Sequence, residues 1–151
     1  GAYVTFSDVV DYFVWLGGEV SDQTDPRARI VAAGEAIHAH EKHLTDAMIN
    51  GIGNIKGLKD MAEVDIIGGL ENPAREGLVC LTVKGQAAPD IVTKLRKRGI
   101  RTHTRKADHY SGNVLSPLGL DAAVRVSMCH YNTETEVAQF LTAMREIVEG
   151  V

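Results

Sequence analysis

The chain has 151 residues, 44% of them hydrophobic and 24% charged, as expected for one globular domain with a substantial core. Its formal net charge of -4 argues against the positive field that draws proteins to nucleic acid, so no nucleic-acid partner is expected. No apolar run approaches the ~20 residues that cross a bilayer, and the first residues do not resemble a secretion signal. We therefore expect a soluble, cytoplasmic protein without a membrane partner, in which Cys80 and Cys129 are reduced thiols.

Two helices are predicted before the first strand. Apolar residues recur at helical spacing between Phe6 and Leu16, and Gly17-Gly18 is expected to end this short helix. Asp25-Pro26 is a typical helix start, and the apolar stripe that follows predicts a long helix to about Asn50.

Three histidines, His38, His40 and His43, crowd the second predicted helix and suggest a metal site. Their spacing argues against one, because two ligands on one helical face favour a separation of four residues and no pair of the three has it. No metal is expected, and the role of the cluster stays open.

The remaining elements alternate between short strands and helices. After an irregular stretch from residue 55 to 63, the pattern predicts strands at 64–67, 77–84, 100–104 and 124–129, and helices at 88–98 and 134–148. Short strands joined by hairpin-like turns, with helices gathered on one face, indicate an α+β fold with a small antiparallel or mixed sheet, preceded by two linking helices.

The strand around Arg125 is the most informative segment. Alternation places Val124, Val126 and Met128 on one apolar face and Arg125 on the other, with Cys129. An arginine in such a strand requires an anionic partner. Two interpretations follow: an internal ion pair with Asp or Glu, or a bound carboxylate.

A loop dense in polar groups precedes this strand. Residues 105–113 read Arg-Lys-Ala-Asp-His-Tyr-Ser-Gly-Asn and include His109, Tyr110 and Ser111, which can donate, accept or transfer protons. Loops of this composition are where sites are commonly built.

Four segments together resemble a known family: residues 78–85 (LVCLTVKG), 95–100 (LRKRGI), 108–112 (DHYSG) and 124–137 (VRVSMCHYNTETEV). They resemble the C-terminal small domain of class V aminotransferases, in the cysteine desulfurase-like branch. The two helices before residue 51 resemble the segment that joins the large and small domains of that family. The resemblance implies an interdomain segment with a short helix at 1–25 and the small domain at 26–151.

The resemblance implies a pyridoxal phosphate enzyme, usually a homodimer, that acts on an amino acid. In the family a preceding large domain supplies the cofactor lysine, so the chain is expected to lack that N-terminal domain and to bind no cofactor alone. Arg125 matches the arginine that binds the substrate carboxylate, a task suited to a bidentate guanidinium. His109, Tyr110 and Ser111 fall in the loop that carries the desulfurase cysteine, and they are expected to contact substrate.

Serine occupies the family's loop cysteine position, at Ser111, so no catalytic residue is assigned in this chain and a thiol-dependent desulfurase is not expected. Cys80 is expected to be remote because it lies in a separate strand, whereas Cys129 shares the face of Arg125. The expected parent is an aminotransferase, lyase or epimerase. The alternative is a stand-alone α+β module that binds a small ligand or dimerises without catalysis.

Overall fold

The computed structural model describes residues 1–150, which divide into two compact units, Gly1–Glu41 and a second unit that begins at Lys42. The first unit holds α1 (Ala2–Val20) and the first part of α2 (Pro26–Asn50). The last part of α2 belongs to the second unit. The predicted start of α2 is confirmed, because the Asp25 carboxylate accepts a hydrogen bond from the Ala28 N–H at 2.9 Å.

The predicted end of the first helix is wrong, since α1 continues through Gly17-Gly18 to Val20. A Cβ atom on Gly17 would lie 2.0 Å from the Arg29 carbonyl oxygen, so glycine here permits close approach of the two helices rather than a turn. The helix ends at Ser21, which is extended and whose hydroxyl donates to the Gly17 carbonyl at 2.6 Å.

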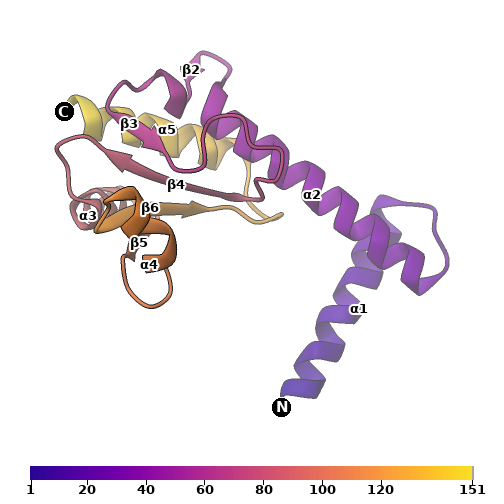
Figure 1. Cartoon of the computed structure of the whole chain (residues 1–151). Helices are drawn as coiled ribbons and strands as arrows, with labels where there is room; N and C mark the ends of the chain where they lie inside the picture. The colour runs from indigo at the N-terminus through magenta and orange to yellow at the C-terminus, as the bar shows by residue number, and fades with distance from the viewer. Residues whose placement is uncertain (151) are drawn as a thin grey trace. The chain divides into compact units, whose positions relative to one another are not determined.

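A four-stranded antiparallel sheet organises the second unit (Figure 1). Its strands are β3 (Val64–Ile66), β4 (Leu78–Val83), β6 (Ala122–Ser127) and β5 (His103–Lys106), in that spatial order. All three pairings are antiparallel, which confirms the predicted α+β class.

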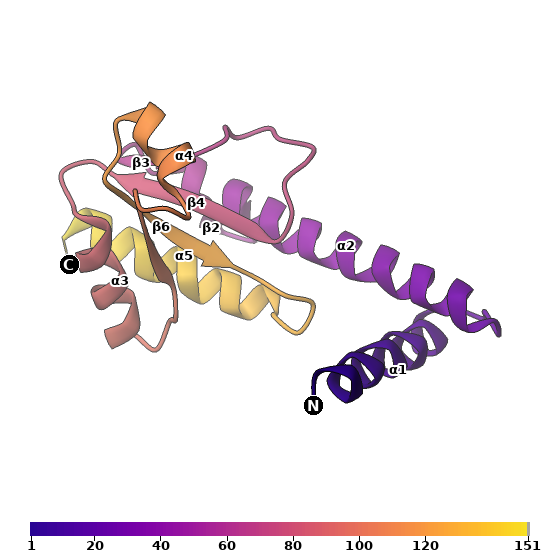
Figure 2. The ribbon, with the colours of Figure 1, turned by 60° about the horizontal axis from the view of Figure 1, so that its bottom comes forward.

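One face of the sheet is covered by helices. Figure 2 shows α3 (Ala88–Lys97) and α5 (Glu134–Glu149) on the opposite side of the sheet from α4 (Gly112–Leu115). The apolar residues of β4 and β6 on the covered face join side chains from α2, α3 and α5 in one core. Its fully buried members include Leu44, Leu81, Ile91, Val124 and Leu141.

The helix that follows β6 begins with the predicted capping box. The Thr133 hydroxyl accepts from the Glu136 N–H at 3.3 Å, and the Glu136 carboxylate accepts from the Thr133 N–H at 2.8 Å. This cap fixes where α5 turns back under the sheet.

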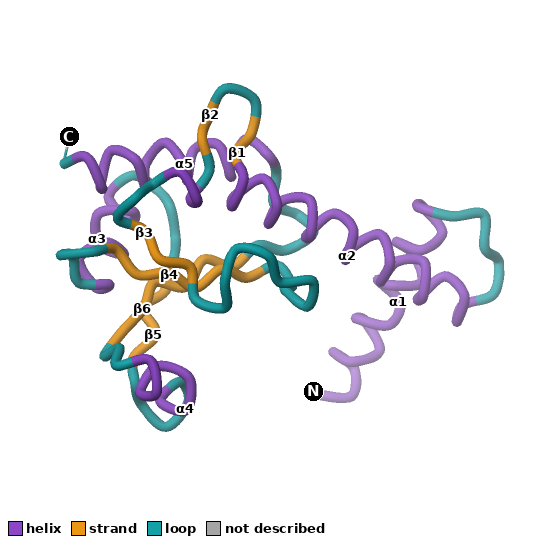
Figure 3. Tube along the Cα trace, turned by 45° about the horizontal axis from the view of Figure 1, so that its top comes forward, coloured by secondary structure: helices purple, strands orange, loops and turns teal. Residues whose placement is uncertain are grey.

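Short elements between α2 and β3 were not predicted, two of them in the stretch 55–63 that was expected to be irregular. Strands β1 (Gly51–Ile52) and β2 (Ile55–Lys56) form a hairpin that packs against α5, and a 3-10 turn follows at Leu58–Asp60 (Figure 3). Two-residue strands carry no alternation, so their sequence alone does not indicate them.

The edge strand β5 begins and ends two to three residues later than predicted, at His103–Lys106. Arg105 and Lys106, expected in the loop, therefore belong to the sheet. The polar loop is correspondingly shorter and leads into α4 and a 3-10 turn at Ser116–Leu118.

Candidate functional site

The sheet face opposite the helical layer carries an arginine in its centre. Arg125 of β6 pairs with Cys80 of β4 on one side and with His103 of β5 on the other. Directly paired residues share a face, so these three side chains form a row across three strands. The row confirms the predicted alternation, because Val124 and Val126 are buried on the other face while Arg125 is half-buried here.

The Arg125 guanidinium has no anionic partner within residues 1–150. The structure gives it no hydrogen bond or ion pair in that range, and its Nε atom is buried without an acceptor. Buried polar groups are almost always paired, and an orphan requires an explanation. The first interpretation, an internal ion pair, has no partner among the described residues. The second is favoured, because a bound carboxylate would accept hydrogen bonds from the N–H groups of the Arg125 guanidinium.

A pocket of about 400 Å³ opens above this face. Its polar lining comes from Arg105, Arg125, Cys80, Tyr110 and Ser111. Its apolar lining comes from Ile67, Leu78, Val114 and Leu115. Apolar walls with a few convergent polar groups are typical of a small-molecule site.

The loop above the pocket is shaped by Asp108. The Asp108 carboxylate accepts from the backbone N–H of Tyr110 at 2.9 Å and of Ser111 at 3.2 Å. These two hydrogen bonds hold the pKa of Asp108 below its ordinary value. The carboxylate thereby fixes the backbone that presents Tyr110 and Ser111 to the pocket.

The structure brings together three of the four site residues predicted from the sequence. Arg125, Tyr110 and Ser111 line the pocket, whereas His109 is exposed and is not part of the lining. The His109 ring instead packs on the Tyr110 ring, with 4.0 Å between the centroids.

Cys80 is the thiol that lies in the pocket, and the expectation that it is remote is wrong. Its separate strand, β4, is the direct neighbour of β6, and Cys80 stands opposite Arg125. Burial raises the pKa of the Cys80 thiol, while the positive charges of Arg125, then Arg105, act in the opposite direction. The net shift is upward, so the thiol is protonated near neutral pH.

Cys129 lies beyond the end of β6 and does not line the pocket. Its backbone N–H donates to the Asn132 side chain at 2.8 Å, in the turn before α5. The neighbouring Cys129 thiol raises the pKa of Tyr131.

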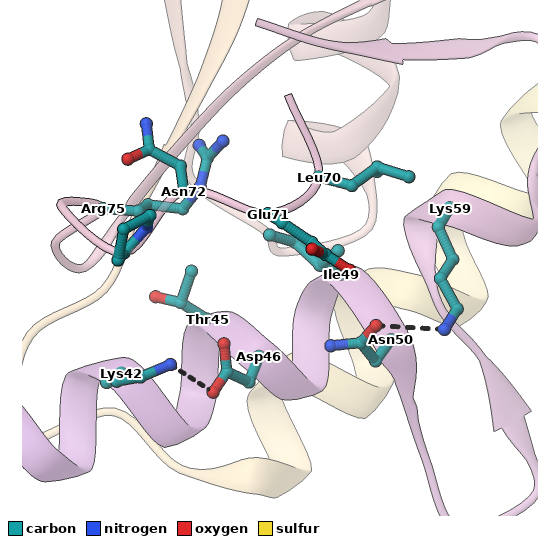
Figure 4. Close-up of a pocket in the computed structure, with 11 residues that line it drawn as sticks. Lys42, Thr45, Asp46, Ile49, Asn50, Lys59, Leu70, Glu71, Asn72 and Arg75 are labelled. Atoms are coloured by element: carbon teal, nitrogen blue, oxygen red, sulfur yellow. Dashed lines mark hydrogen bonds and ion pairs between the residues drawn. The ribbon is translucent and has the colours of Figure 1, made fainter. Parts of the chain in front are cut away.

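A second pocket, of about 560 Å³, lies between the end of α2 and the 70–75 loop (Figure 4). Its Arg75 has a buried Nε without an acceptor, but the guanidinium donates to the carbonyls of Ile67 at 3.4 Å and Gly69 at 2.6 Å. Lys42 is paired with Asp46 at 2.7 Å, and Lys59 donates to Asn50 at 3.0 Å. Because these pairs satisfy their own charges, this pocket presents a weaker case for a ligand than the one around Arg125.

The histidine cluster gains no metal partners in the part of the chain that the structure describes. No group of three or more His, Cys, Asp or Glu side chains there is arranged to hold a metal ion. His43 instead pairs with Glu134 of α5, with 2.5 Å between Nε2 and Oε1. Within residues 1–150, no helix has the length and apolar character needed to span a membrane.

Comparison with known proteins decides the family. Residues 30–140 match the model of the aminotransferase class-V family, which is most of the chain. The chain belongs to this family. The resemblance of the four segments around Arg125 is thereby confirmed.

The relatives to which this chain is similar include probable cysteine desulfurases. A probable cysteine desulfurase of Pseudomonas putida is 28% identical over 114 residues, which cover 76% of this chain and 25% of the relative. One from Mycolicibacterium paratuberculosis is 30% identical over 116 residues, 77% of this chain and 16% of the relative. The apo structure of the cysteine desulfurase from Thermococcus onnurineus NA1 has a TM-score of 0.68 and 27% identity, over 83% of this chain and 32% of that one. The chain thus spans a quarter or less of the length of these two curated relatives.

Proposed function

We propose that this chain is the C-terminal, substrate-binding part of a pyridoxal phosphate enzyme of the class V family that acts on an amino acid. In this proposal residues 1–25 belong to the interdomain segment and residues 26–151 to the small domain. A larger N-terminal domain supplies the cofactor site, and the whole enzyme is a cytoplasmic homodimer. The short span relative to the desulfurase-like relatives supports the missing domain.

The observation that carries the proposal is the unpaired Arg125 guanidinium in the floor of a pocket. Every amino-acid substrate has an α-carboxylate, and a guanidinium binds a carboxylate through two parallel charge-assisted hydrogen bonds. Arg125 would therefore hold the substrate by the one group that is common to all amino acids. Tyr110 and Ser111 would contact the rest of the substrate from the loop, with His109 supporting the Tyr110 ring.

The residues of this pocket do not fit pyridoxal phosphate by themselves. The cofactor, when bound, acts as an electron sink for carbanions and is attached through a lysine amine. The nine lining residues include no lysine, so the pocket offers no such amine. We therefore assign these residues to the substrate and derive no chemical step from them.

We further propose that the enzyme is not a thiol-dependent desulfurase. Sulfur transfer to the enzyme requires a thiolate nucleophile, and the Ser111 hydroxyl cannot form a persulfide. Cys80 reaches the pocket, but the upward shift of its pKa disfavours the thiolate. Because neither the Ser111 hydroxyl nor the protonated Cys80 thiol suits sulfur transfer, we expect the enzyme to catalyse a different reaction of the amino acid.

The test uses the complete reading frame that contains this chain, expressed and loaded with pyridoxal phosphate. Arg125→Gln should lower kcat/KM for amino-acid substrates by roughly ten- to a hundred-fold, because a charge-assisted pair contributes about 1.5–3 kcal/mol. The visible absorption of the cofactor should be unchanged. Arg101→Gln is the matched control, since Arg101 is an exposed arginine that does not line the pocket.

Two results would contradict the proposal. Equal kinetics for Arg125→Gln and wild type would remove Arg125 from substrate binding. Rapid sulfide release from L-cysteine that disappears in Cys80→Ser, but not in Cys129→Ser, would make the enzyme a thiol-dependent desulfurase after all.

A further inference from the structure

A second arginine shares the pocket with Arg125. Arg105 of β5 is paired with Ala123 of β6, and Arg125 is paired with His103 of β5. Arg105 and Arg125 are therefore diagonal neighbours on one face of an antiparallel pair, a relation in which Cα atoms lie roughly 7–8 Å apart. Long side chains bridge that separation easily.

The residue between the two arginines leaves room for both side chains. Ala123 is on the same face as Arg105 and Arg125 and has no exposed surface. Leu115 of α4, 3% exposed, lines the same pocket. The methyl group at position 123 takes little of the space on this face, where both arginines and Leu115 line the pocket.

Neither arginine is neutralised within the described range. Like Arg125, the half-buried Arg105 has no hydrogen bond or ion pair to any other group in residues 1–150. Both side chains line the pocket together with Cys80. Two like charges at this separation repel each other, and the repulsion is strengthened by the surrounding apolar walls.

A single α-carboxylate uses one guanidinium and leaves the other uncompensated. We propose that Arg105 binds a second anionic group, so that the substrate is a short amino acid with an acidic side chain, of the aspartate or glutamate type. This inference rests on the proposed role of Arg125 and names the substrate class of the same pocket. A volume of about 400 Å³ holds such a molecule.

The selectivity that follows has a simple physical basis. An amide side chain has nearly the shape of a carboxylate but cannot neutralise a guanidinium. A bound ligand that carries an amide in place of the side-chain carboxylate therefore leaves the Arg105 charge desolvated and unpaired. L-Asparagine is thus the matched comparison for L-aspartate, and L-glutamine for L-glutamate.

The experiment measures direct binding of L-aspartate and L-asparagine to the full 151-residue chain. Chemical shifts of the arginine side-chain N–H groups and of the pocket backbone amides are followed during titration. L-Aspartate should bind at least roughly ten-fold more tightly than L-asparagine. Arg105→Gln should reduce this ratio to about one, chiefly by weakening L-aspartate, whereas Arg125→Gln should weaken both ligands.

Lys106→Gln is the control for net charge, because Lys106 is the next residue of β5, is exposed and does not line the pocket. It should leave both affinities unchanged. Backbone amide spectra establish that each variant keeps the fold.

Each contrary result has a defined meaning. A wild-type ratio near one, an Arg105→Gln ratio equal to that of wild type, or no binding of L-aspartate at tens of millimolar would overturn the acidic-substrate proposal. An Arg125→Gln variant that binds L-asparagine as wild type does would instead overturn the proposed role of Arg125. Glutamate and glutamine repeated in the same series show which side-chain length places its carboxylate on Arg105.

Discussion

Replacement of Arg125 by methionine separates a ligand-binding arginine from a structural one. Methionine keeps an unbranched apolar stem of similar reach and removes the guanidinium. If Arg125 stabilised the fold through an internal ion pair, the substitution would leave its carboxylate partner buried without a counter-charge. The free energy of unfolding would then fall by about 3–5 kcal/mol. The structure instead leaves its Nε atom buried and unpaired.

The expected change in the free energy of unfolding follows from the unpaired Nε–H group of Arg125. A buried N–H without an acceptor costs roughly 1–3 kcal/mol, and removing it recovers part of that free energy. The rest of the guanidinium is only half-buried, and its contact with solvent reduces the recovery. We therefore expect Arg125→Met to leave the free energy of unfolding unchanged or to raise it by up to about 1 kcal/mol.

Native-state hydrogen exchange of the β4 and β6 backbone amides is the suitable assay, because it reports unfolding of the second unit. Fluorescence does not, since the single tryptophan, Trp15, lies in the first unit. Leu141→Ala serves as the positive control: Leu141 is fully buried, and its truncation should cost about 2–5 kcal/mol. A loss above about 2 kcal/mol for Arg125→Met would mean that the arginine has a structural partner and would refute the reasoning.

Two further predictions concern the titrating groups around the pocket. The Asp108 carboxylate has a depressed pKa, so its stabilisation of the loop is present above the ordinary value of about 3.9 and is lost as the pH falls through the folded-state pKa. Asp108→Asn should remove that acid transition, which the two loop amides report in a pH titration by NMR; an identical transition in the variant would exclude Asp108 as its source. The rate at which iodoacetamide alkylates Cys80, measured in a Cys129→Ser background, should rise with a midpoint above the ordinary thiol pKa, and Arg125→Gln should move it higher still because a positive charge is lost. A downward movement of that midpoint would contradict the placement of Arg125 beside the thiol.

Local signals in the sequence were sufficient for the long elements. The Asp25-Pro26 start of α2 and the Thr133 capping box of α5 are interactions within one turn, so their residue types alone predict them. Gly17-Gly18 carries the same local signal as a helix end, but here the deciding contact comes from Arg29, twelve residues later. Residue types within one helical turn do not indicate a contact with a residue this far along the chain.

The site shows the same limit more sharply. Alternation correctly placed Arg125 on the polar face of its strand, because face is a property of a single strand. Which residues stand beside Arg125 depends on strand order and register, and these depend on contacts between distant segments. Cys80 is 45 positions before Arg125 and became its neighbour only through the β4–β6 pairing, whereas Cys129, four positions away, lies outside the pocket.

Arg105 illustrates why the register also decides specificity. A β5 strand that ended at Thr104, as predicted, would leave Arg105 in a loop with no defined direction. The observed strand continues to Lys106 and pairs Arg105 with Ala123, which fixes the side chain on the face of Arg125. A slip of one residue in this pairing would turn Arg105 to the opposite face of the sheet and place Thr104 beside the pocket. The two-arginine arrangement, and the preference for an acidic substrate that we derive from it, therefore rest on the register of one edge strand rather than on any local motif.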